Sequence, residues 1–162
     1  KILMPEPGLS PYMAAAKRTV QMSRILGALR ERIDKDEKAA LSEGGDFDPS
    51  GVEETAGLPT EGKAAAAVLN ARIESRYREE RGRIMRAVLC WYRDLLLCRC
   101  RGDAELLCYP EHQAQLQCQA GHLTYRQAIG NVQVIERMQR QLSRISKADE
   151  IVVSVAFAHL TA

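Results

Sequence analysis

Residues 86–107, RAVLCWYRDLLLCRCRGDAELL, decide the fold of this chain. The stretch belongs to a predicted helix with a helix-favouring composition. From Ile84 onward this helix is apolar on almost every side, and it ends at Gly102-Asp103. A helix of this kind is normally covered by other helices, so we expect it at the centre of a bundle. We take its middle residues as candidates for core or interface: Trp91, Tyr92, Arg93, Asp94, Leu95, Leu96 and Leu97.

Helical patterns continue on both sides of this segment. The segment itself is the second half of a helix expected over 63–101, with a kink at Gly82. An earlier helix is expected from Ser10-Pro11 to about Ser42, because serine caps helices and proline suits their first position. Shorter helices are expected over 110–120, 125–146 and 150–160. The predicted fold class is therefore all-α, a bundle of about five helices of which two are long.

Two of the shorter helices carry more specific predictions. Residues 150–160, EIVVSVAFAHL, have a strand-like composition, but no other candidate strand exists to pair with them, which favours a buried helix. Thr124 is expected to cap the helix over 125–146. Apolar residues in that helix alternate at spacings of three and four, with one glutamine among them: Ile129, Val132, Ile135, Gln139, Leu142 and Ile145.

The domain organisation follows from where these patterns stop. Residues 1–9 contain proline and glycine and are expected to be an extended lead-in from a preceding N-terminal region. Residues 44–62, GGDFDPSGVEETAGLPTEG, combine five glycines and two prolines with acidic side chains. We expect residues 10–162 to form one helical domain, with an acidic loop inserted at 43–62.

The charges are divided unevenly along the chain. Residues 31–61 contain ten acids and three bases, whereas residues 72–101 contain nine arginines and four acids. The two regions are expected to meet each other or to meet partners. Four arginines share one side of the long helix and raise the alternative of a nucleic-acid-binding module or an inter-subunit face: Arg72, Arg76, Arg83 and Arg86.

A zinc-stabilised adaptor is a further alternative. Its candidate ligands are Cys98, Cys108, Cys118 and His122. Zinc is usually held by four thiolate or imidazole ligands that tight turns present in pairs, and Cys98 and Cys100 are too close together for the usual pair. We expect these cysteines to serve as small apolar fillers and expect no metal.

The sequence contains no arrangement typical of an enzyme. Carboxylate pairs such as Glu79-Glu80 lie in charged helix rather than beside apolar residues. The glycines lack the Gly-Lys-Ser/Thr ending of a phosphate-binding loop. We therefore expect no catalytic residue, no cofactor and no small-molecule substrate for this chain.

Composition also bears on location. No run of about 18 apolar residues occurs, and the N-terminal KILMPEPGLSPYM lacks the apolar core of a signal peptide, so no membrane contact is expected. The five cysteines are an odd number in apolar or helical surroundings, which favours a reducing compartment. The cytoplasm is the expected location.

Two stretches together resemble a known family. Trp91-Tyr92-Arg93-Asp94-Leu95-Leu96-Leu97, followed by RQAIGNVQVIERMQRQLSRISKADEIVVSVAFAHL at 126–160, is similar to the C-terminal helical domain of bacterial DNA polymerase III delta-prime subunits. The second motif comprises Arg140, Leu142 and Arg144, and the resemblance covers about residues 80–162. Related gamma/tau-type subunits use a similar domain, so the resemblance leaves the type of subunit open.

The resemblance implies a role in DNA replication. In this family the C-terminal helical domains of sibling subunits join into a collar, and the ATP-driven complex loads a sliding clamp on DNA. The chain would then be a non-catalytic collar piece whose partners are other clamp-loader subunits, with DNA contacted through the complex. Arg93 and Asp94 would orient neighbouring helices or fix the register between subunits.

Overall fold

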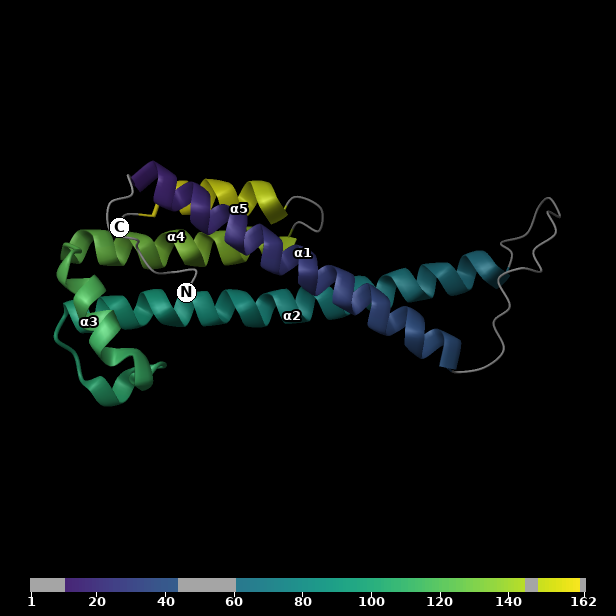
Figure 1. Cartoon of the computed structure of the whole chain (residues 1–162), viewed down its shortest axis with the longest axis horizontal. Helices are drawn as coiled ribbons and strands as arrows, with labels where there is room; N and C mark the ends of the chain where they lie inside the picture. Colours follow the sequence, from purple (N-terminus) through teal and green to yellow (C-terminus); the bar gives the residue numbers. More distant parts are fainter. Residues whose placement is uncertain (1–10, 44–60, 145–148, 161–162) are drawn as a thin grey trace. The chain divides into compact units, whose positions relative to one another are not determined.

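The computed structural model describes residues 11–43, 61–144 and 149–160. These residues form five α-helices and no strand, which confirms the predicted all-α bundle with two long helices (Figure 1). The chain divides into two compact units. In the described residues, the first unit comprises 11–25, 81–144 and 149–160, and the second comprises 26–43 and 61–80.

The observed helices follow the predicted ones closely. The long helices are α1, Pro11–Glu43, and α2, Glu61–Arg99. Gly82 lies inside α2, whose helical assignment is continuous there. The expected cap Ser10 and nearly all of the acidic insert fall outside the described residues.

The connection after α2 is more structured than predicted. It contains two short 3₁₀ turns, η1 at Ala104–Leu106 and η2 at Pro110–His112. The predicted helix over 110–120 is therefore split, with its first turn in η2 and the rest in α3, Gln113–Gly121. Proline favours a helical first turn because its φ is already close to helical values.

The end of α2 has a specific geometry. Gly102 N donates to Leu97 O over 3.0 Å and Arg101 N donates to Cys98 O over 3.2 Å. This pair of bonds is a Schellman motif, in which one residue adopts the left-handed conformation. That residue is Arg101, with φ at 54°. Gly102 leaves room for the Leu97 side chain, which would have to move if residue 102 carried a Cβ.

Helix α4, Tyr125–Arg144, begins as predicted at Thr124. Gln127 N donates to Thr124 Oγ1 over 3.3 Å, and Thr124 N donates back to Gln127 Oε1 over 2.8 Å. These reciprocal bonds form a capping box, which satisfies two backbone groups that a helix start leaves free.

The buried stripe of α4 differs from the predicted one. The buried residues are Ala128, Asn131, Ile135, Met138 and Leu142, whereas Ile129 and Val132 are half-buried and Ile145 lies outside the described residues. The polar residue in the stripe is Asn131 rather than Gln139, which is half-buried. The spacing of three and four was correct, and Ile135 and Leu142 were placed correctly, but the buried residues Ala128, Asn131 and Met138 each precede the predicted position by one residue. Ala128 is followed by the larger Ile129, and Asn131 is followed by the apolar Val132. A sequence pattern favours the large apolar residue of each pair as the buried one.

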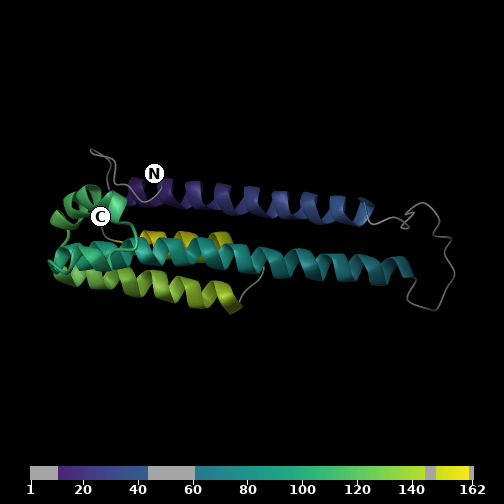
Figure 2. The ribbon, with the colours of Figure 1, turned by 90° about the horizontal axis from the view of Figure 1, so that it is seen from below.

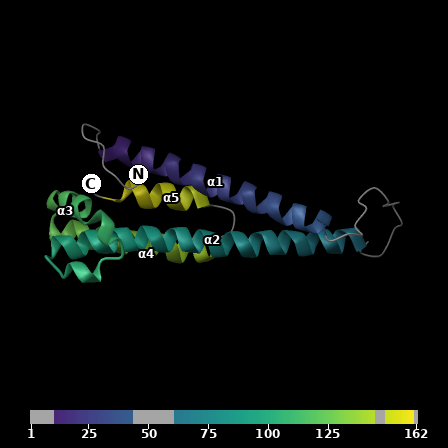
Figure 3. The ribbon, with the colours of Figure 1, turned by 60° about the horizontal axis from the view of Figure 1, so that its bottom comes forward.

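Helix α5, Asp149–Ala158, confirms the helical interpretation of the last segment. It lies between α4 and the first half of α1 (Figures 1 and 2). Within the first unit, α4 also runs beside the second half of α2, and α3 lies at the end where α2 stops (Figures 1 and 3). The core of this unit is apolar, and its largest fully buried side chains include Met22, Met85, Leu116, Ile135, Met138, Val153 and Phe157.

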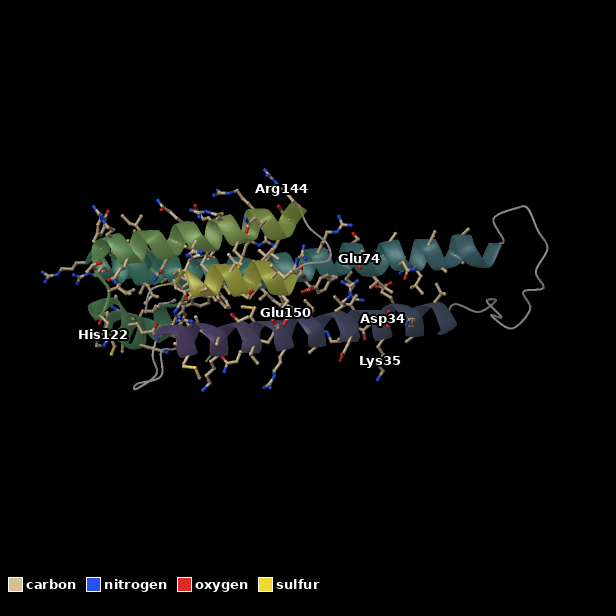
Figure 4. All side chains as sticks on the ribbon, turned by 90° about the horizontal axis from the view of Figure 1, so that it is seen from above. Asp34, Lys35, Glu74, His122, Arg144 and Glu150 are labelled. Atoms are coloured by element: carbon tan, nitrogen blue, oxygen red, sulfur yellow. The ribbon has the colours of Figure 1, made fainter. Side chains whose placement is uncertain are left out.

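The second unit is a pair of antiparallel helical segments, 26–43 of α1 and 61–80 of α2. Its buried apolar residues are Leu26, Leu29, Ile33, Ile73 and Tyr77. Charged side chains fill the space beside this apolar seam, while Lys35 points away from α2 (Figure 4). The Arg30 guanidinium lies 5.1 Å from the centre of the Tyr77 ring, a cation–π arrangement.

Candidate functional site

The Trp91–Leu97 motif lies in the first unit, on the second half of α2. Trp91, Tyr92 and Leu95 are buried in the core. Leu96 and Leu97 are half-buried, and Arg93 is exposed. The buried face therefore holds the two aromatic residues together with Leu95 and Asp94, and Arg93 lies outside it.

Asp94 is the most buried residue of the motif, with an exposed fraction of 0%. Its carboxylate accepts a hydrogen bond from Cys108 N over 3.1 Å and another from Tyr109 N over 2.9 Å. Hydrogen bonds to a charged acceptor are stronger than neutral ones. Asp94 thus fixes the connection between α2 and α3 against α2, and the Asp94 charge also contributes to raising the pKa of the Cys108 thiol.

Three aromatic rings gather where this connection meets α2. The centroids of Trp91 and Tyr109 are 6.1 Å apart, those of Trp91 and His112 are 5.8 Å apart, and those of Tyr109 and His112 are 6.4 Å apart. The Tyr109 hydroxyl donates to Ala87 O over 3.2 Å. Trp91 Nε1 is buried and finds no acceptor among the described residues. The cluster packs η2 onto α2 through ring contacts rather than through a polar network.

Tyr92 is held in an apolar environment beside α1. Burial raises its pKa to about 12, and the positive charge of Arg18 acts in the opposite direction. Arg18 is itself buried, and its Nε and Nη2 find no hydrogen-bond acceptor in the described part of the chain. Burial thus holds the Tyr92 hydroxyl in its neutral form up to strongly alkaline pH.

A second buried charge was not singled out from sequence. Arg81 has an exposed fraction of 3%. Its Nη1 donates to Asp149 Oδ1 over 2.5 Å, and its Nη2 donates to Leu142 O over 2.6 Å. Arg81 therefore links α2 to the end of α4 and to the start of α5. In the sequence it lies in the charged stretch EERGR, where nothing distinguishes it from solvent-exposed neighbours.

Two members of the predicted arginine row pair with carboxylates of α1. In the second unit, Arg76 Nη1 lies 2.9 Å from Glu37 Oε1 and Arg72 Nη2 lies 3.1 Å from Glu37 Oε2. Arg76 also lies 3.6 Å from Asp36. Arg83 and Arg86 belong to the first unit and are exposed. The acidic and basic regions of the sequence thus meet within the second unit, where the carboxylates offset two of the four arginines.

The candidate metal ligands do not come together. Throughout the described residues, no group of three or more His, Cys, Asp or Glu side chains is arranged to hold a metal ion. Cys98 lies on α2, Cys108 in the connection, Cys118 on α3 and His122 just after it. The zinc interpretation therefore finds no ligand set in this part of the chain.

The hollows of the described surface include one in each unit. One, of about 440 Å³, is in the second unit and is lined by Arg30, Asp34, Asn70 and Glu74 among others. The other, of about 360 Å³, lies beside the end of α2 and is lined by Leu97, Cys98, Arg101 and Gln113 among others. Neither lining contains a histidine, so neither hollow pairs a nucleophilic side chain with a histidine base.

The outward side of α5 is apolar. Ile151 and Val155 are exposed by 66% and 52%, respectively. They are four residues apart and share one side of the helix with Ala158, which is also exposed. The opposite side carries the buried Val152, Val153, Ala156 and Phe157. On α1, Met13 and Val20 are likewise large, apolar and exposed.

Two general comparisons were made, one with membrane-spanning helices and one with known proteins. No helix among the described residues has the length and apolar character needed to cross a bilayer. No protein-family model, curated protein sequence or solved structure matches the chain.

Proposed function

We propose that the chain is a helical assembly domain of a DNA polymerase III clamp-loader subunit, delta-prime-like, which joins sibling subunits in a collar and performs no reaction itself. The proposal rests on the resemblance of the Trp91–Leu97 and Arg140–Arg144 motifs to that family. It also agrees with the all-α architecture, in which these motifs lie on adjacent helices of one unit.

One structural observation carries the assembly role: the apolar outward side of α5. An amphipathic surface helix normally turns polar residues to solvent, and a helix that is apolar on both sides is normally covered on both. The exposed Ile151 and Val155 break that pattern. Burying such a side chain contributes roughly 1.5–3 kcal/mol, so a partner helix over α5 would add substantially to association.

Direct nucleic-acid binding is less well supported. Phosphate contacts require arginines that are free to replace counterions. Two of the four candidates, Arg72 and Arg76, already pair with Glu37. The other two candidates, Arg83 and Arg86, are exposed and lie in the first unit.

The test is co-elution with the C-terminal helical domains of the other clamp-loader subunits from the same organism, at micromolar concentration on gel filtration. We expect a shared peak for the unmodified chain. Ile151→Glu should abolish it, because a carboxylate would be buried in an apolar contact.

Leu106→Glu is the matched control, since Leu106 is exposed by 61% but lies in η1 rather than on α5. It should leave the shared peak unchanged, and circular dichroism should show both variants folded. Separate elution of the unmodified chain would overturn the assembly role. Equal loss in both variants would overturn the assignment to α5.

A further inference from the structure

Two cysteines from separate segments meet beside the motif. Cys90 is half-buried on α2, and Cys108 is exposed in the connection between η1 and η2. They are separated in sequence by the end of α2, Asp103 and η1, yet a side-chain hydrogen bond with Cys90 raises the pKa of the Cys108 thiol, so the two side chains are neighbours. The other cysteines lie at the end of α2 and on α3.

The backbone explains why the two thiols meet. Cys108 N is hydrogen-bonded to Asp94, which follows Cys90 by one helical turn and therefore lies on the same side of α2. The next residue, Tyr109, bonds to Asp94 through its N–H and to Ala87 O through its hydroxyl. Residues 108–109 are thus held at two points, on either side of the turn that carries Cys90.

We propose that Cys90 and Cys108 form a thiol modification site, which a small-molecule disulfide converts into an intramolecular disulfide. Neither residue takes part in the proposed assembly face on α5, so the site stands independently of that role.

The reaction proceeds by two thiol–disulfide exchanges. The Cys108 thiolate, which is exposed, attacks one sulfur of the small disulfide and releases one small thiolate, leaving a mixed disulfide on Cys108. The Cys90 thiolate then attacks the Cys108 sulfur and releases the second small thiolate. The two protein thiols lose two protons and two electrons, and the oxidant takes up both as two thiols.

The rate should depend steeply on pH. The hydrogen bond that the Cys108 thiol makes to Cys90, together with burial and the charge of Asp94, raises the pKa of the Cys108 thiol above its usual value. Because the thiolate is the nucleophile, the exchange should be slow near neutral pH and should accelerate as the pH rises toward and past 9. Proximity favours the second step, since the resolving thiol is already in contact.

The disulfide would have a structural consequence. It would join the connection covalently to α2, next to the place where Trp91 contacts Tyr109 and His112. Closing the loop of chain between the two cysteines also restricts the unfolded state. The oxidised chain should therefore unfold at a higher denaturant concentration than the reduced chain.

The experiment uses the chain with Cys98→Ser, Cys100→Ser and Cys118→Ser, which leaves only the pair, and glutathione disulfide as oxidant. After checking the fold by circular dichroism, we expect both thiols to be lost, with no glutathione retained and a monomer on a non-reducing gel. Adding Cys90→Ser provides the matched control, which should stop at the glutathione adduct on Cys108.

Three results would overturn the proposal: a persistent glutathione adduct in the pair-only chain, disulfide-linked dimers, or no thiol loss under conditions in which the unfolded chain reacts. Peptide mapping of the unmodified chain gives a second measurement that does not depend on any substitution. It should recover the peptide that links Cys90 to Cys108, and a majority of other pairings would contradict the assignment.

Discussion

Arg81 and Asp149 are 68 residues apart in sequence, and Arg81 Nη1 donates to Asp149 Oδ1 over 2.5 Å. The same guanidinium donates to Leu142 O. One side chain of α2 thus fixes the end of α4 and the start of α5, the helix whose outward side carries the proposed assembly face. The energetic consequence of this contact can be measured directly.

Arg81→Met should destabilise the chain by about 3 kcal/mol, because it removes a charged donor from the partly buried Asp149 carboxylate and from the buried Leu142 carbonyl. Urea unfolding followed by circular dichroism measures the loss. Arg86→Met is the matched control on the exposed side of the same helix and should change stability by less than about 0.5 kcal/mol. Similar losses in both variants would show that the guanidinium contacts contribute little.

Asp94→Ala should cost on the order of 3 kcal/mol, because two backbone N–H groups lose a charged acceptor. Asp103→Ala is the comparison, since the exposed Asp103 accepts one bond, from Glu105 N at 3.0 Å. It should cost about 1 kcal/mol as a lost cap. Hydrogen exchange of the Cys108 and Tyr109 amides should accelerate only in the first variant, and unchanged protection there would contradict the contacts.

Ionisation of Tyr92 makes the free energy of unfolding depend on pH in the alkaline range. Its pKa is raised from 10.0 to about 12 in the folded chain, chiefly by burial. Between these values the unfolded chain ionises Tyr92 and the folded chain does not. Its contribution to stability is therefore complete below pH 10 and decreases up to about 12, by roughly 3 kcal/mol in total. Tyr92→Phe should flatten the fall in unfolding free energy over this range, and an unchanged slope would be inconsistent with a neutral buried hydroxyl.

The end of α2 predicts opposite effects for neighbouring substitutions. Arg101 has a φ of 54°, so Arg101→Gly should stabilise the chain by about 0.5–1 kcal/mol. Gly102→Ala should destabilise it, because the added Cβ would collide with the Leu97 side chain. Thermal unfolding of the two variants should shift the Tm in opposite directions. Shifts in the same direction would show that the helix end is not closed in this way.

Local features of the sequence were sufficient to place the five helices, although the helix predicted over 110–120 is split into η2 and α3. Thr124 and Gln127 form the expected start of α4, and α5 is a helix despite its β-branched composition. These features depend on hydrogen bonds between residues a few positions apart, which a sequence pattern displays directly. The spacing of the α4 stripe was likewise visible, whereas its phase was not.

The contacts of the charged and thiol-bearing side chains were decided only by the tertiary structure. Arg81 looked like one of many surface arginines, and Cys90 and Cys108 looked like unrelated fillers. The packing of α2 against α4, α5 and the connection to α3 determines which of them is buried and which group each one faces. Sequence alone thus determined where helices form, because helices depend on neighbours along the chain. The tertiary structure decided which polar groups pair, because only long-range packing brings those partners together.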